Sequence, residues 1–190
     1  MKKYFLLLFL LLSTFIYAQE VDTHLKFKGI EITGSIDYFV EQLKKEGYEL
    51  SRQSGDYATL TGKFANSNCS VIVYTTPKSK QVYAVIVLYD EASSWSSLKL
   101  DYLNFKKLLT QKYQVTPRSS ETFVSPYYEG DGYELQATKN SKCFYYSIYD
   151  VAHGEIRLAI VNKRINIMYT DSSGNLINER EEKADALDDL

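Results

Sequence analysis

Residues 34–48 read GSIDYFVEQLKKEGY and carry the clearest helical pattern in the chain. The apolar residues recur at the i, i+3, i+4 and i+7 spacing of a single helix face: Ile36, Phe39, Val40 and Leu43. Ser35 is suited to cap the first backbone N–H groups, and Gly47 favours the left-handed turn that ends a helix. A helix with one apolar face must cover another element, so this stretch predicts a neighbouring sheet.

A second helix is predicted within residues 93–117, which read SSWSSLKLDYLNFKKLLTQKYQVTP. Apolar and aromatic residues again recur every three or four positions: Trp95, Leu98, Tyr102, Phe105, Leu109 and Tyr113. Ser94 is a plausible cap, and Pro117 cannot continue a helix. This helix also has a single apolar face, which predicts that it packs against a sheet.

Strand-like runs follow each predicted helix. In residues 155–161 apolar and polar positions alternate, which is typical of a strand with one face exposed to solvent. Residues 82–89 are apolar on both faces and indicate a central strand. The remaining predicted strands lie at residues 57–64, 69–74, 143–149 and 164–169.

The order of these elements predicts an α+β fold. We expect a tandem pair of helix-plus-antiparallel-sheet units, α-β-β-β-β followed by α-β-β-β. The first unit is assigned to residues 19–92 and the second to residues 93–178. Residues 179–190 form an acidic tail.

Residues 1–18 read MKKYFLLLFLLLSTFIYA and resemble a secretory signal. Lys2 and Lys3 precede an apolar run, and small Ala18 stands before the expected cleavage point. We therefore expect a periplasmic or secreted protein. An uncleaved anchor is the alternative, although the run is shorter than the ~20 residues that span a bilayer. No membrane span is expected after cleavage.

Charge argues against nucleic acid as a partner. The chain has 22 Lys and Arg against 24 Asp and Glu, and the acidic excess lies in the tail EREEKADALDDL. Without Lys2 and Lys3 of the signal-like segment, the body of the chain, residues 19–178, is neutral and has no basic excess with which to bind phosphates. The tail is interpreted as a solvated helix end, with an interaction tail as the alternative.

The two cysteines follow similar residues, in NSNC (66–69) and NSKC (140–143). An exported chain enters a compartment where disulfides persist, so Cys69 and Cys143 are candidates for one bridge. Such a bridge would join the two units and stabilise the fold by about 4 kcal/mol. Two buried free thiols and a reactive nucleophile are the alternatives.

No catalytic, metal or cofactor motif stands out. The chain has two histidines, His24 and His153, and His153 is expected at the far end of the strand that Cys143 begins. None of these residues has the close paired spacing of a zinc site. Phosphate-binding loops and nucleophile elbows are also missing, so we expect no cofactor.

Residues 125–133 read SPYYEGDGY, a mixture of Tyr, Gly and Ser that adaptable contact loops favour. The candidate partner-binding residues are Tyr127, Tyr128 and Tyr133. A flexible acidic turn is the simpler interpretation. A calcium-binding loop is a weaker alternative, because the stretch lacks the twelve-residue series of oxygen ligands that such a loop contains. Most of the 17 tyrosines suit half-buried sheet faces.

Three stretches resemble a group of uncharacterised exported proteins of Bacteroidetes-type bacteria. They are HLKFKGIEITGSIDYFVEQLKKEGY, WSSLKLDYLNFKKLLTQKY and GEIRLAIVNKRINIMYTDSSGN, and they cover about a third of the chain. The chain departs from that group at Glu31, where proline is frequent, and at Gln114, where glycine is expected. The resemblance implies an envelope or secreted location. The order of elements is also similar to β-lactamase inhibitory protein, a likeness of architecture alone.

These observations favour an exported, non-catalytic binding or inhibitor-like module that acts through a sheet face or a loop. Its partner is expected to be a protein or a glycan of the cell envelope or exterior. An envelope hydrolase, with a site assembled only in three dimensions, is the alternative from a different class. A structural envelope protein is the third interpretation.

Overall fold

The computed structural model describes residues 23–188. The predicted signal peptide, residues 1–18, lies outside this range, as do residues 189–190 of the tail. The dominant element is an eight-stranded antiparallel sheet with the order β3-β4-β5-β6-β10-β9-β8-β7. A two-stranded sheet of β1 (Lys26–Phe27) and β2 (Ile30–Glu31) precedes it in the chain.

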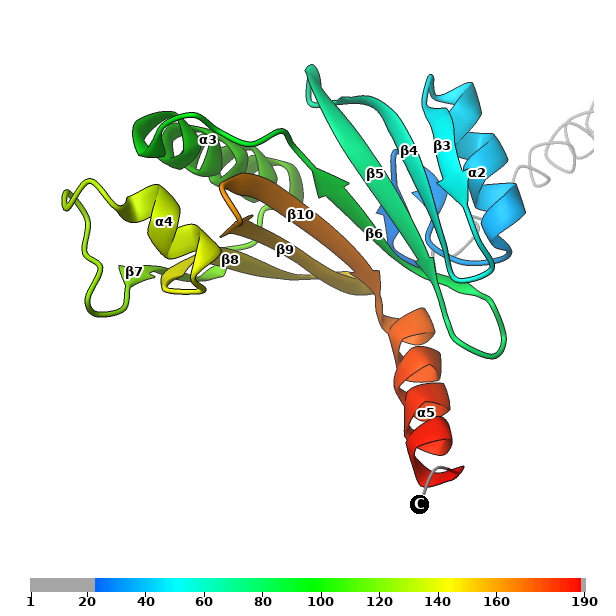
Figure 1. Cartoon of the computed structure of the whole chain (residues 1–190). Coiled ribbons are helices and arrows are strands. Elements are labelled where there is room, and N and C mark those ends of the chain that lie inside the picture. The colour runs from blue at the N-terminus through cyan, green and yellow to red at the C-terminus, as the bar shows by residue number, and fades with distance from the viewer. Residues whose placement is uncertain (1–22, 189–190) are drawn as a thin grey trace, which may run out of the picture.

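Each half of the large sheet follows a helix (Figure 1). The first half consists of α2 (Ile36–Lys45), β3 (Glu49–Gln53), β4 (Tyr57–Phe64), β5 (Ser67–Thr75) and β6 (Val82–Leu88). The second consists of α3 (Trp95–Tyr113), β7 (Arg118–Phe123), α4 (Glu134–Lys139), β8 (Cys143–Val151), β9 (Gly154–Val161) and β10 (Arg164–Asp171). Helix α5 (Ser172–Asp188) follows β10. Within residues 23–188, no helix combines the length and apolar content needed to cross a membrane.

The structure confirms the α+β class and the order of a helix followed by antiparallel strands in each half. It differs in two respects. The strands belong to one continuous sheet, because β6 and β10, the last strands of the two halves, pair with each other. The second half also has four strands, since Arg118–Phe123 forms the edge strand β7.

The capping predictions for both helices are confirmed. The Ser35 side chain accepts a hydrogen bond from the backbone N–H of Tyr38 at the start of α2. Ser94 does the same for the N–H of Ser97 at the start of α3. Each cap satisfies a donor that the first helical turn leaves without a partner.

One row of side chains runs across the middle of the sheet and forms its core. The strand registers align Leu60, Val71, Val87, Ile167 and Leu158 on β4, β5, β6, β10 and β9. All five are fully buried. The predicted apolar faces of α2 and α3 belong to the same buried cluster, so both helices lie on this face of the sheet.

A hydroxyl network attaches α3 to the second half of the sheet. Tyr102 of α3 and Ser147 of β8 are both fully buried, and their hydroxyl oxygens lie 2.7 Å apart. The Ser147 hydroxyl also lies 3.0 Å from that of Ser119 on β7. Burial raises the pKa of Tyr102 to about 12. Buried hydroxyls require such partners, so the network fixes where α3 lies along β7 and β8 as well as its distance from the sheet.

Asp171 connects three parts of the chain. It ends β10 and caps α5, because its Oδ2 atom accepts the backbone N–H of Gly174 at 2.8 Å. Its Oδ1 atom accepts the N–H of Leu25 at 2.8 Å, and His24 Nδ1 lies 3.1 Å from Oδ2. The carboxylate is fully buried. The N-terminal segment is therefore held to the sheet at the point where the last helix begins.

Helix α5 includes residues 179–188 of the predicted tail. Near its start it packs against β6 so closely that a Cβ on Gly174 would lie 2.8 Å from Tyr83 Cβ. Farther along, the Glu181 carboxylate accepts the backbone N–H groups of Lys78 and Ser79 in the β5–β6 loop. Lys78 also pairs with Asp185 at 2.7 Å. Part of the tail's acidic charge is thus used to attach the helix to this loop.

We predict that Asp171→Ala lowers the free energy of unfolding by about 2 kcal/mol or more, because two buried backbone N–H groups lose their acceptor. Chemical denaturation monitored by circular dichroism measures the change. Asp56→Ala is the control, since Asp56 is exposed and pairs with Lys80 at the surface; it should cost less than about 1 kcal/mol. Equal losses in the two variants would contradict the role assigned to Asp171.

Candidate functional site

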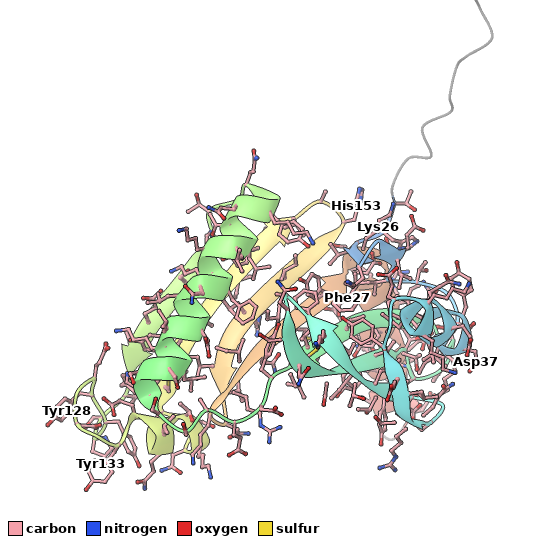
Figure 2. All side chains as sticks on the ribbon, turned by 90° about the horizontal axis from the view of Figure 1, so that it is seen from above. Lys26, Phe27, Asp37, Tyr128, Tyr133 and His153 are labelled. Carbon is pink, nitrogen blue, oxygen red and sulfur yellow. The ribbon has the colours of Figure 1, made fainter. Side chains whose placement is uncertain are left out.

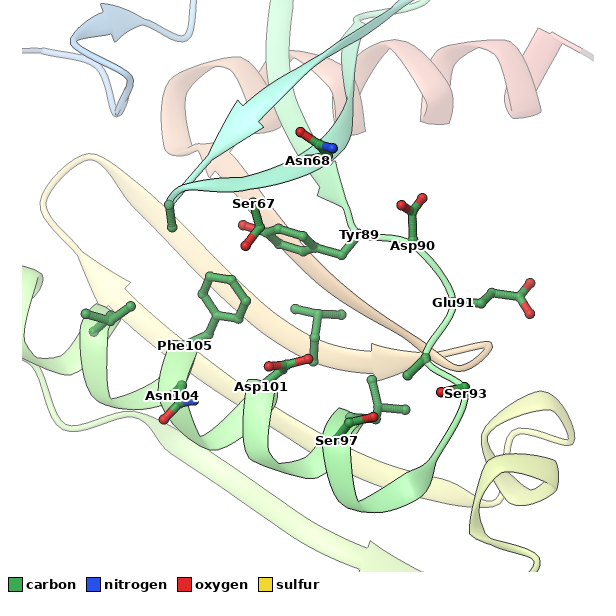
Figure 3. Close-up of a pocket in the computed structure, with 15 residues that line it drawn as sticks. Ser67, Asn68, Tyr89, Asp90, Glu91, Ser93, Ser97, Asp101, Asn104 and Phe105 are labelled. Carbon is green, nitrogen blue, oxygen red and sulfur yellow. The ribbon is translucent and has the colours of Figure 1, made fainter.

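A cleft of about 670 Å³ lies between α3 and the turn that joins β4 to β5 (Figure 3). Three parts of the chain contribute its polar side chains. Ser67 and Asn68 come from the start of β5, Asp90 and Glu91 follow β6, and Asp101 and Asn104 lie on α3. The cleft is positioned where the two halves of the sheet meet, because each helix covers its own half.

Aromatic rings form part of the apolar lining of the cleft. The rings of Tyr89 and Phe105 have centroids 4.9 Å apart. The Tyr89 hydroxyl donates a hydrogen bond to the backbone oxygen of Phe64 at 3.0 Å, and burial raises its pKa. Tyr89 is therefore held in place from the far side of the cleft.

The charged side chains that line the cleft are all negative. Its lining includes the carboxylates of Asp90, Glu91 and Asp101, and it includes no Lys, Arg or His among the described residues. Glu91 pairs with Arg164, which lies outside the cleft, at 3.1 Å. The arrangement therefore favours groups that carry positive charge or donate hydrogen bonds.

The second candidate surface is the sheet face opposite α2 and α3, called here the open face. The apolar residues near its centre come from five neighbouring strands: Ile72 and Tyr74, Ile86 and Leu88, Met168, Ala159, Tyr146 and Ile148. The polar side chains of Asn166 and Arg157 lie among them. Along β5, β8 and β10 the side chains alternate between buried and half-buried or exposed positions. The open face is therefore in contact with solvent while it carries many apolar groups.

Most charged groups of the open face lie at its margins, whereas Arg157 of β9 lies between Met168 and Ile148 near its centre. Arg118 pairs with Asp150 at 3.0 Å near one edge of the sheet. Near the other edge, the Arg52 guanidinium lies 5.6 Å from the centre of the Tyr57 ring. The apolar centre is thus bordered by groups that bind water well.

The structure places the three predicted tyrosines around one loop, residues 124–133. Tyr128 and Tyr133 are 65% and 62% exposed and project at one end of the molecule (Figure 2). Tyr127 is half-buried, and its hydroxyl accepts a hydrogen bond from Asn140 at 2.7 Å. The loop therefore presents two of the three side chains to solvent.

The acidic residues of this loop hold its backbone. Asp131 accepts the N–H groups of Tyr128 and Tyr133 at 3.0 and 2.7 Å, and Glu134 accepts that of Gly130 at 2.8 Å. Residues 23–188 contain no group of three or more side chains arranged to hold a metal ion. The carboxylates act as turn acceptors, so Tyr128 and Tyr133 stand on an ordered backbone.

Glu129 attaches the loop to the rest of the fold. Its carboxylate pairs with Lys99 of α3 and accepts a hydrogen bond from the Tyr145 hydroxyl at 3.0 Å. The hydrogen bond from Lys99 is the largest cause that lowers the pKa of Glu129, and the Tyr145 hydroxyl adds to it. The loop is therefore connected to both α3 and β8.

The predicted bridge between Cys69 and Cys143 is absent, and both residues are free thiols. Cys69 lies on β5 and Cys143 on β8, with β6, β10 and β9 between them. Four spacings of about 4.8 Å separate the strands by roughly 19 Å, well beyond the ~7 Å limit of a disulfide. The two NSxC stretches also begin non-equivalent strands, the third of the first half and the second of the second. Burial raises the pKa of Cys69, and that of Cys143 to about 11.

The two histidines lie apart from the cleft lining. His24 contacts Asp171, a partner 147 positions away that the sequence did not indicate. His153 lies in the β8–β9 turn, as expected, and its φ of 65° is left-handed. Its backbone oxygen accepts the N–H of Ser172 at 2.9 Å. Both histidines are thus found beside the junction of β10 and α5.

No family model matches this chain, and no curated protein or solved structure gives a significant match. Function is therefore inferred from the surfaces described above.

Because the two thiols lie on distant strands, we predict that alkylation in denaturant without reductant adds two labels to the chain. Intact mass spectrometry counts them. A mass that shows no label would mean that the cysteines are bonded and would contradict the strand order around β5 and β8.

We also predict that Lys99→Met raises the pKa of Glu129 towards the ordinary value of a glutamate. A lowered pKa in the folded chain means that this contact stabilises the fold above the ordinary pKa, and that the contribution is lost as the pH falls through the lowered value. An NMR titration of the side-chain carboxyl group measures it. Lys107→Met, a change at an exposed lysine of the same helix, should leave the Glu129 titration unchanged.

Proposed function

We propose that the chain is an exported, non-catalytic binding module that holds a folded protein on its open face. The observation that carries this proposal is the contrast between the two faces of one sheet. In the middle of the sheet the side chains directed towards α2 and α3 are fully buried, whereas Ile72, Ile86 and Met168 lie side by side on the other face and are half-buried. Large apolar patches at a protein surface commonly mark interaction sites.

The composition of the open face fits a protein partner better than a glycan. Its centre is mainly aliphatic and aromatic with Arg157 among these residues, and charged pairs such as Arg118 with Asp150 lie at its margin. Stable protein interfaces have this apolar centre and polar rim, with Tyr, Phe, Met and Arg enriched. The flexible side chain of Met168 can adapt to the shape of a partner, whereas the ring of Tyr146 provides a large, rigid contact.

The loop of residues 124–133 is the second contact element of the proposal. Tyr128 and Tyr133 are exposed, and Asp131 fixes the backbone beneath both. A preorganised aromatic contact loses less conformational entropy on binding than a flexible one. The loop is suited to add affinity at one end of the molecule.

The exported location is part of the proposal and is supported by the signal-like residues 1–18. It places the partner in the periplasm, the envelope or the exterior.

The open face is tested by site-specific photocrosslinking in cells that produce the chain. A photoreactive phenylalanine analogue replaces Tyr146 or Met168 on the open face, and Leu100, 59% exposed on α3, is the control position. We predict that one identified protein is crosslinked from both open-face positions and not from Leu100. Tyr146→Ala should then weaken the affinity for that purified protein by about tenfold, as expected for a buried interface aromatic.

Crosslinks that arise equally from Leu100, or no crosslinks from the open face, would overturn the proposal. A crosslinked product made of two copies of this chain would identify the occupant as a second copy and would replace the foreign partner.

A further inference from the structure

We propose that the cleft between α3 and the β4–β5 turn is a separate binding site for an extended, basic peptide segment. The site lies on the side of the sheet that α2 and α3 cover, away from the open face. This proposal can therefore be tested independently of the proposal that the open face binds a protein. Its ligand class follows from the charge, the hydrogen-bonding groups and the shape of the cleft.

The charge of the cleft is uniformly negative. Asp90, Glu91 and Asp101 line a space of about 670 Å³ (Figure 3). Glu91 pairs with Arg164, which is not among the lining residues. A concave site with one sign of charge and apolar walls concentrates its electric field and attracts ions of the opposite sign. Lys and Arg side chains carry that charge at every physiological pH.

The hydrogen-bonding groups of the cleft match the same ligands. Carboxylates accept hydrogen bonds, whereas ammonium and guanidinium groups only donate them. Among the described residues, Asp90 and Asp101 have no side-chain hydrogen bond to a neighbour. Both carboxylates are therefore available to a donor from a ligand, and charge-assisted bonds of this kind are stronger than neutral ones.

The apolar lining suits the hydrocarbon part of a long basic side chain. Phe105 is half-buried beside Tyr89, and Leu108 is exposed at the margin of the cleft. A Lys or Arg stem can pack on such groups while its charged end reaches a carboxylate. The face of an aromatic ring adds a favourable contact with the cation itself.

The shape of the surface indicates a peptide and not a single amine. A second depression of about 640 Å³ adjoins the cleft and shares Asn68 and Asp90 with it. It adds the carboxylates of Glu46 and Glu49, and Lys63 is the one basic side chain of its lining. Glu46 also pairs with Lys28 at 3.7 Å. The acidic path thus continues past the β4–β5 turn, and several basic side chains of one extended segment can bind along it.

The experiment uses residues 19–190 of the chain and a fluorescein-labelled nonapeptide of alternating lysine and glycine. Fluorescence anisotropy measures binding at low and at physiological salt. We expect binding that weakens with salt, as it does for paired charges near a surface. In the double variant Asp90→Asn/Asp101→Asn the dissociation constant should rise at least tenfold.

A double variant with the same change in net charge is the matched control. Glu41→Gln/Asp56→Asn removes two exposed carboxylates that pair with Lys44 and Lys80 outside the cleft. Its dissociation constant should stay within twofold of that of the unchanged chain. Thermal unfolding of all variants should be similar, because the four substituted side chains are exposed.

Three results would overturn the proposal. The first is that adding the original chain leaves the anisotropy of the peptide constant. The second is that both double variants lose the same affinity for the peptide. The third is that spermine binds at least as tightly as the peptide. NMR provides a second readout, since the peptide should shift the amide signals of Asn104 and Phe105. Tyr146→Ala on the open face should bind the peptide normally, which separates this site from the protein-binding face.

Discussion

The antiparallel pairing of β6 with β10 is the constraint on which the rest of the structure depends. It places Val87 beside Ile167 and Val85 beside Tyr169, and these four side chains form the middle of the core. Without this pairing each half would be a four-stranded sheet with an unpaired edge, which is an unfavourable arrangement for the backbone groups at that edge. With it, both helices lie on one face and the opposite face remains open.

Periodicity in the sequence predicted the parts of the fold that bury an apolar stripe. The pattern identified α2, α3 and the central strands because each directs such a stripe at the core. It missed β7, whose residues RSSETF are polar, since this edge strand is specified by its pairing with β8. It also missed where α5 begins, because Asp171 caps that helix while it binds Leu25 from the other end of the chain.

The functional surfaces were predictable to the extent that their signals are local. Tyr128 and Tyr133 stand in a short stretch rich in Gly and Ser, and the loop does expose them. The cleft was not predictable, because Asn68, Asp90 and Asp101 come from segments that only the sheet topology brings together. The disulfide prediction failed for the same reason. A repeated NSxC pattern contains no information on which strands are neighbours, and β5 and β8 are not.

The two proposed sites share strands and differ in the face that they use. Ile165 of β10 lines the cleft, whereas Met168, three residues later, lies on the open face. Successive side chains of a strand point to opposite faces, so one strand can supply contacts to both sites without conflict. A peptide in the cleft and a protein on the open face would therefore be separated by the thickness of the sheet, and both can be bound at once. This arrangement is possible because α2 and α3 lie on the same side of the sheet and leave Ile72, Ile86 and Met168 on the other side accessible to a partner.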